Sequence, residues 1–216
     1  MGEDFGFIIE KTITYKKERK FMKKTNNKGF SLVELIIVIA IMAILAGAIA
    51  PALIKYIDKS RKSNDVSSAK TIKTAVETAL GNEDCYSYLA GAASSTADLV
   101  FKVATNKSTA ATALPDIPAN GPTGYDGDLK KADVQELIFS NIGEKTPKLK
   151  FKKAIDKYLS ATPTDFFVSI SQKGTVAVFV GSAAPSGKDL ASDKGGNGTT
   201  AKTYVQLTPE LSQAYQ

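Results

Sequence analysis

A run of twenty residues without a charge, 35–54, constrains this chain more than any other feature. It lies in a longer apolar stretch, residues 30–57, whose only charged residues are Glu34 and Lys55. At about 1.5 Å rise per residue, a helix of this length spans the roughly 30 Å hydrocarbon core of a bilayer. A buried core helix is the alternative, but such helices rarely stay apolar on every face for so long. We therefore predict a transmembrane helix over residues 30–54.

A second helical pattern follows the apolar run without a break. Residues 55–80 carry charges, Asp65 among them, and contain no Gly or Pro. Apolar residues recur there at three- and four-residue steps, at Val66, Ala69, Ile72, Val76 and Ala79/Leu80. Gly81 and Asn82 are typical of a helix C-terminus. We predict one helix over residues 30–80, about 75 Å long, whose amphipathic half packs on the rest of the chain.

Pro51 interrupts the apolar half of this helix. Proline lacks a backbone N–H, and its ring clashes with the carbonyl four residues earlier, here that of Gly47. The pattern predicts a kink or a loosened turn between Gly47 and Pro51. A kink that only serves curvature remains an alternative.

The rest of the chain predicts an α+β fold, in which the long helix packs on a small antiparallel β-sheet head. Strand patterns cover residues 165–171 and 175–181, joined by a tight turn at 172–174, and a third strand is expected at 203–207. Helices are expected at 133–142 and 148–159, with short ones in 83–105, for example 96–103. Residues 107–128 and 182–202 are predicted loops, the second of them exposed. The expected divisions are 1–29, 30–54 and a head of 55–216 that includes the 55–80 helix.

Composition argues against an enzyme. The chain has no His and one Cys, Cys85, which excludes Ser-His-Asp and Cys-His catalysis and an internal disulfide. We expect Cys85 to be a small buried hydrophobe, and we predict no catalytic residue, metal or cofactor. A basic run is interpreted as a solvated helix face, with a DNA-binding or surface-adhesion patch as the alternative; it comprises Lys145, Lys148, Lys150, Lys152, Lys153 and Lys157.

The segment before the apolar run is basic: residues 1–29 hold eight Lys/Arg and four Asp/Glu, against twenty and eighteen in the remainder. An ordinary secretory signal cut after Ala48 is one explanation. Against it, the apolar run is too long, continues in phase into an amphipathic helix, and contains Glu34 near its start. A charge inside a transmembrane helix costs roughly 2.5–3.5 kcal/mol. Glu34 either snorkels to the membrane surface or needs a cationic partner, and a cut before Phe30 would create an amine four residues away.

Residues 28–35, Lys-Gly-Phe-Ser-Leu-Val-Glu-Leu, followed by an apolar stretch, resemble the prepilin motif of type IV pilins and pseudopilins. The resemblance implies that a prepilin peptidase cuts between Gly29 and Phe30 and N-methylates Phe30. It implies that Glu34 neutralises the N-terminal amine of an adjacent subunit, and that the region of Gly47 and Pro51 can partly unwind in the filament. Many pilins close a C-terminal loop with a disulfide. With Cys85 alone, that closure must be non-covalent here.

The resemblance also implies partners and a location. The precursor would be a single-pass cytoplasmic membrane protein that contacts lipid, the peptidase and a pilus assembly platform, and then a homo-oligomeric extracellular filament for adhesion, motility or DNA uptake. Family leaders are often shorter than 29 residues, so we expect Met22 to be the true start and residues 1–21 to be a misassignment. The alternatives are a pseudopilin of a type II secretion or competence system and a signal-anchored extracellular binding protein.

Overall fold

The computed structural model describes residues 29–103, 117, 119–142, 147–196 and 199–216. The chain forms two compact units, one up to Gly47 and one over Ala48–Gln216, called the head below. Helix α1, Leu32–Leu80, contributes to both units and confirms the single helix expected over residues 30–80. It begins two residues later than expected. Most of the predicted loop at 107–128 lies outside the described residues.

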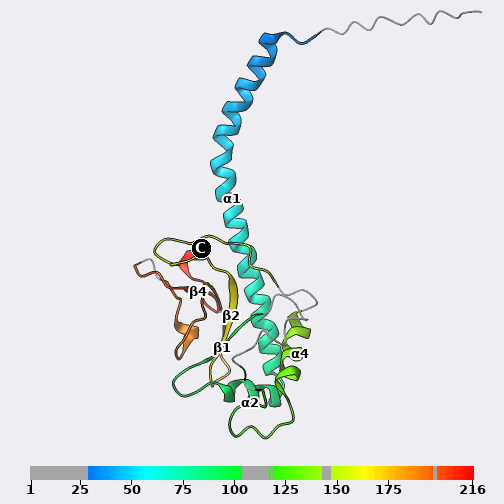
Figure 1. Ribbon diagram of the computed structural model, residues 1–216, viewed down its shortest axis with the longest axis vertical. Helices are drawn as coiled ribbons and strands as arrows, with labels where there is room; N and C mark the ends of the chain where they lie inside the picture. The colour runs from blue at the N-terminus through cyan, green and yellow to red at the C-terminus, as the bar shows by residue number, and fades with distance from the viewer. Residues whose placement is uncertain (1–28, 104–116, 118, 143–146, 197–198) are drawn as a thin grey trace, which may run out of the picture. The chain divides into compact units, whose positions relative to one another are not determined.

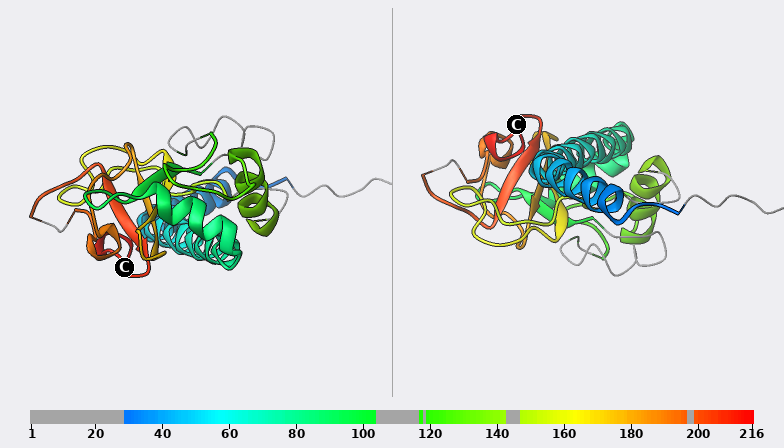
Figure 2. Two further views of the ribbon diagram at one scale, coloured as in Figure 1. Left: turned by 90° about the horizontal axis from the view of Figure 1, so that it is seen from below. Right: turned by 90° about the horizontal axis from the view of Figure 1, so that it is seen from above.

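The second half of α1 forms one wall of the main core. Its buried residues are Asp65, Ala69, Ile72, Ala75, Val76 and Ala79, which confirms the predicted apolar stripe. Val66 and Leu80 at its edges are partly buried. Figures 1 and 2 show the sheet and helix α4, Lys131–Ile142, on different sides of this part of α1. The amphipathic pattern therefore marks the helix face that the head covers.

The sheet has four antiparallel strands in the order β1-β2-β3-β4. They are β1 Leu99–Lys102, β2 Asp165–Ile170, β3 Val176–Gly181 and β4 Tyr204–Thr208. The predicted hairpin is confirmed, because Ile170 pairs with Val176 around the turn at 172–174. The third predicted strand is confirmed as β4, which pairs with β3.

Both faces of the sheet are buried. Phe166, Val168 and Ile170 face the main core, as their alternation predicts. On the opposite face a smaller cluster contains Phe167, Ala177, Phe179, Tyr204 and Leu190. Leu190 belongs to a short 3-10 helix, η2, Leu190–Ser192. The prediction of an exposed loop over residues 182–202 was therefore wrong in part, since this segment covers the second face of the sheet.

Two predicted helices were wrong. Residues 96–103 contain strand β1 instead, because pairing with β2 outweighs local helix propensity. Residues 148–159 contain no helix. Lys148, Lys150 and Lys152 are exposed while Leu149 and Phe151 are buried, an alternation with the period of extended chain. The interpretation of the lysine run as a helix face fails for the same reason.

Two other predicted helices are confirmed. Helix α4 confirms the helix expected at 133–142, and α2, Glu83–Ala92, confirms the expectation of a short helix within 83–105.

Candidate processing and assembly site

Gly29, Phe30 and Glu34 lie at the start of α1. Gly29 and Phe30 precede the helix, and Phe30 is 89% exposed. A Cβ added at Gly29 would meet nothing within 4 Å. Among the described residues, nothing therefore imposes a steric need for glycine at Gly29. The predicted cleavage between Gly29 and Phe30 stays a prediction.

Glu34 takes part in a capping box, which the sequence analysis missed. The Ser31 hydroxyl accepts a hydrogen bond from the Val33 N–H at 3.3 Å, and the Ser31 N–H donates to Glu34 Oε2 at 2.8 Å. This reciprocal pattern satisfies two donors at a helix N-terminus. The signal was present in the sequence as Ser-x-x-Glu ahead of an apolar run. Among the described residues, Oε1 of Glu34 has no hydrogen-bond partner.

Nothing in the described part of the chain covers the apolar half of α1. Its large hydrophobic side chains are exposed from Phe30 to Ile57. By length and composition α1 can cross a membrane, and none of its most apolar window is buried. Each Å² of such surface costs about 25 cal/mol in water. This surface therefore needs lipid or other copies of the chain around it.

Gly47 and Pro51, the predicted kink positions, both lie inside the continuous helix α1. A Cβ at Gly47 would meet nothing within 4 Å. Among the residues that the structure describes, nothing packs closely enough on Gly47 to require its small size. A loosened turn between Gly47 and Pro51 stays a prediction.

Asp65 is a buried anchor that the sequence analysis counted only among the charges of the amphipathic half. Its carboxylate accepts the N–H of Lys150 at 2.7 Å and that of Phe151 at 2.8 Å. Burial raises the pKa of Asp65, and the two N–H donors offset part of that shift. Asp65 thereby holds the extended segment at 147–151 against α1. The signal was its position four residues before Ala69, on the buried helix face.

A polar clasp closes the segment between η2 and β4. Lys202 Nζ donates to Asp193 Oδ2 at 2.8 Å, the Tyr204 hydroxyl donates to the same oxygen at 2.7 Å, and the Gly195 N–H donates to Oδ1 at 2.9 Å. Burial opposes ionisation of Asp193, but these donors outweigh it and lower its pKa. The same pairing raises the pKa of Lys202. The clasp is a non-covalent closure, of the kind expected for a chain with one cysteine.

Cys85 is fully buried in the main core, as expected for a small hydrophobe, and burial raises the pKa of its thiol to about 11. It lies in α2, where its backbone N–H donates to the Asn82 side chain at 3.0 Å. A thiol with this pKa is almost entirely protonated at neutral pH and is a poor nucleophile. Cys85 therefore fills space in the core.

The start of α1 is also where known sequence patterns match. The model of the prokaryotic N-terminal methylation motif matches residues 24–50. A type IV major fimbrial protein FimA of Dichelobacter nodosus is 34% identical over 107 residues, covering 49% of this chain and 69% of the relative. Another FimA of that organism is 34% identical over 130 residues, 56% of this chain and 74% of the relative. The chain belongs to the type IV pilin family.

The similarity is uneven along this pilin. The type IV major pilin protein PilA of Myxococcus xanthus (strain DK1622) is 39% identical over 61 residues, only 28% of each chain. No solved structure gives a significant match. The α+β fold, with a long helix on a four-stranded antiparallel sheet, is consistent with a pilin.

Proposed function

We propose that this chain is the structural subunit of a type IV pilus, cut between Gly29 and Phe30 and polymerised through residues 30–54. One observation carries the proposal: the methylation motif coincides with an apolar helix surface that the described part of the chain leaves bare. Relatives that are named as major pilins and fimbrial proteins support a structural role over an enzymatic one.

Before assembly, lipid covers the apolar surface and the chain is a single-pass protein of the cytoplasmic membrane. The basic leader stays on the cytoplasmic side by the positive-inside rule, where the prepilin peptidase and the assembly platform act on the chain. Polymerisation replaces lipid contacts with contacts between helices, which gains little from hydrophobicity alone. Small residues permit the close approach that such packing needs, namely Ala40, Ala43, Ala46, Gly47, Ala48 and Ala50.

Glu34 supplies direction and register to this packing. One of its oxygens caps α1, and the other is open to a charge from outside the chain. The methylated amine of Phe30 in a neighbouring copy has the complementary charge. A carboxylate and a protonated amine attract each other more strongly in an apolar layer than in water, and either charge left there without the other is costly, so subunits add where the two groups meet.

The test is the N-terminus of subunits from sheared filaments. We expect N-terminal sequencing and intact mass to show a chain that begins at Phe30 and carries one extra methyl group. A chain that begins at Ile49, or one that keeps residues before Gly29, would contradict the proposal. Electron microscopy of the same cells separates a pilus from a pseudopilin, since only the pilus predicts long extracellular fibres.

The precursor from a peptidase-null strain tests whether translation starts at Met22. Any peptide from residues 1–21 in that precursor would exclude a start at Met22.

A further inference from the structure

We propose that a basic collar on the head binds anionic phospholipid headgroups before assembly, while the pilin is anchored in the membrane. The collar consists of Lys55, Lys59, Arg61, Lys152, Lys153 and Lys157, all exposed. The inference rests on the proposed membrane span over residues 30–54 and adds a second membrane contact made by the head. It gives the unassembled subunit a defined orientation on the membrane surface.

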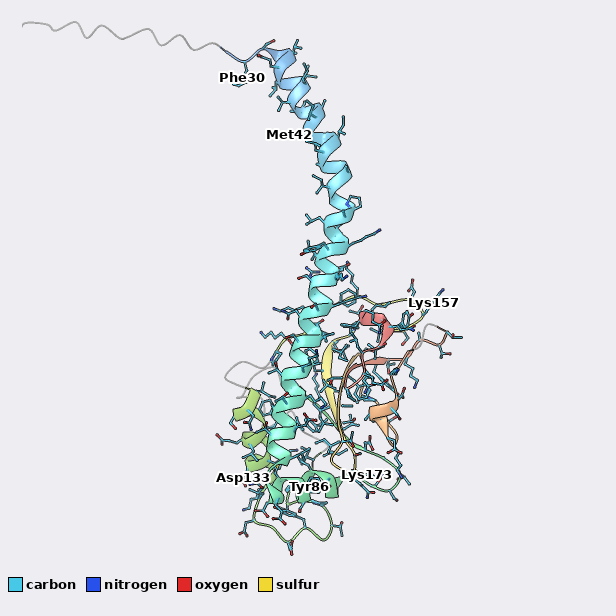
Figure 3. The ribbon with its side chains drawn as sticks, turned by 180° about the vertical axis from the view of Figure 1, so that it is seen from behind. Phe30, Met42, Tyr86, Asp133, Lys157 and Lys173 are labelled. Atoms are coloured by element: carbon cyan, nitrogen blue, oxygen red, sulfur yellow. The ribbon has the colours of Figure 1, made fainter. Side chains whose placement is uncertain are left out.

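Two segments far apart in sequence build the collar. Lys153 Nζ lies 2.5 Å from Asp58 Oδ2, which ties residues 152–157 to the helix turn that carries Lys59 and Arg61. Figure 3 shows Lys157 at the end of the head where its part of α1 begins, while Asp133, Tyr86 and Lys173 lie at the opposite end. The collar therefore lies beside the part of α1 that follows the apolar span.

The collar keeps a surplus of positive charge. Asp58 is already paired with Lys153 and lies 3.9 Å from Arg61, and Asp65 is buried under the segment at 147–151. Among the described residues, Lys55, Lys59 and Lys152 have no ion-pair partner. The opposite end of the head carries both signs, with Glu83 and Asp84 in the first turn of α2, Asp133 in that of α4, and the lysines Lys130, Lys131 and Lys173. The collar therefore differs from that end by its excess of cations over carboxylates.

The residues around the collar match a membrane–water interface. Tyr56 is 74% exposed and lies two residues after Ile54, which is itself exposed, as is Leu53. Tyrosine and lysine are the side chains that anchor a span at headgroup level. Lys59 lies five residues beyond Ile54, roughly 7.5 Å along the helix. That distance is within the Debye length of about 10 Å at 0.1 M salt, so the negative charge of the membrane surface attracts Lys59.

Large domains cross membranes largely regardless of their charge, so a basic head does not oppose the proposed orientation.

The test uses the full chain in vesicles of phosphatidylcholine, with and without phosphatidylglycerol. The chain has no tryptophan, so Tyr158→Trp places a single tryptophan beside Lys157. Lipids with a nitroxide on the headgroup quench this tryptophan when the collar docks. We expect stronger quenching in the anionic vesicles, and loss of the difference in 1 M salt, where the Debye length is about 3 Å.

A matched pair of variants isolates the collar. Lys55→Gln, Lys59→Gln and Lys152→Gln together should weaken docking, by about fivefold for each cation removed. Lys130→Gln, Lys131→Gln and Lys173→Gln remove the same charge at the opposite end and should leave the quenching unchanged. Equal loss in the two triple variants would overturn the proposal, because net charge alone would then explain it.

The remaining outcomes are equally decisive. Equal quenching in the two lipid compositions would overturn the collar, and so would quenching that follows protein density in the membrane, because the occupant would then be a second copy. Retention of the chain on the vesicles at alkaline pH tests the span itself. If the chain is retained but its quenching is the same in neutral and anionic vesicles, only the collar is refuted. A chain that is not retained refutes the span and the collar together.

Discussion

At the start of α1, Glu34 has two roles to be told apart. One of its oxygens accepts the Ser31 N–H and caps the helix, and the other is proposed to pair with a neighbouring subunit. Glu34→Gln keeps a side chain that can complete the capping box but removes the charge. We expect normal cleavage and membrane insertion but at least about a tenfold loss of filaments, since each 1.4 kcal/mol of lost pairing is a factor of ten. Filament yield by shearing, compared with precursor processing on immunoblots, measures this.

Ser31→Ala is the matched control for that variant. It removes the hydroxyl that accepts the Val33 N–H and costs the helix about 1 kcal/mol, while the charge of Glu34 stays. Filaments should persist. If Ser31→Ala abolishes the filaments and Glu34→Gln does not, assembly requires the helix cap. The proposed pair between Glu34 and the amine of a neighbouring subunit would then be contradicted.

A second residue-level prediction concerns Asp65. Asp65→Ala leaves the buried N–H of Phe151 without an acceptor, at a cost of about 1–3 kcal/mol. Hydrogen exchange should show faster exchange of the Lys150 and Phe151 amides, together with a lower melting temperature of the head. Asp156→Ala, at an exposed position five residues beyond Phe151, should change stability by less than about 0.5 kcal/mol. Unchanged protection in Asp65→Ala would show that the segment is held by apolar packing alone.

At the scale of elements, the clasp between η2 and β4 predicts a pH window. Asp193 has a lowered pKa in the folded chain, so its contribution is present above its ordinary pKa and is lost as the pH falls through the folded value. Lys202 has a raised pKa, so its contribution is present at neutral pH and is lost as the pH rises through the folded value. The clasp is therefore strongest in the neutral range and weakens at both extremes.

Asp193→Asn should remove this window. Because both side chains are partly exposed, we expect a loss of only about 1 kcal/mol at neutral pH, with faster protease cleavage within residues 182–202. The difference from the unmodified chain should vanish in acid. Lys194→Gln breaks the exposed pair with Glu210 and serves as the control, with little expected effect. A protease sensitivity of Asp193→Asn that does not depend on pH would argue against the charge pair.

Local patterns predicted some elements and failed for others. The hairpin of β2 and β3 follows from alternation and a short turn, both readable within seventeen residues. Strand β1 does not, because Leu99–Lys102 is extended only through its partner β2, far along the chain. The segment at 147–151 is a similar case, since its backbone donors are satisfied by Asp65 and not by a helix of its own.

At the scale of the whole molecule, the bare helix predicts how filaments come apart. If apolar contacts among residues 30–54 hold the subunits together, 1 M salt should leave the fibres intact, because salt screens only charges. A mild detergent should dissolve them, because it covers the same surface that lipid covers before assembly. Sedimentation and electron microscopy after each treatment measure this. Fibres that dissolve in salt alone would place the main contacts on the charged heads.

The sequence by itself determined the helix, the membrane-length apolar run and the motif at Gly29, Phe30 and Glu34, because each depends on residues close together in the chain. Only the tertiary structure decided the roles of Asp65, Lys202 and the second face of the sheet. Asp65 meets donors far away in sequence, and Lys202 meets Asp193 nine residues earlier in the chain. In neither case does a periodicity show which donor a carboxylate will meet. The collar, too, was visible only in the tertiary structure, since its cations come together only after residues 152–157 fold back onto α1.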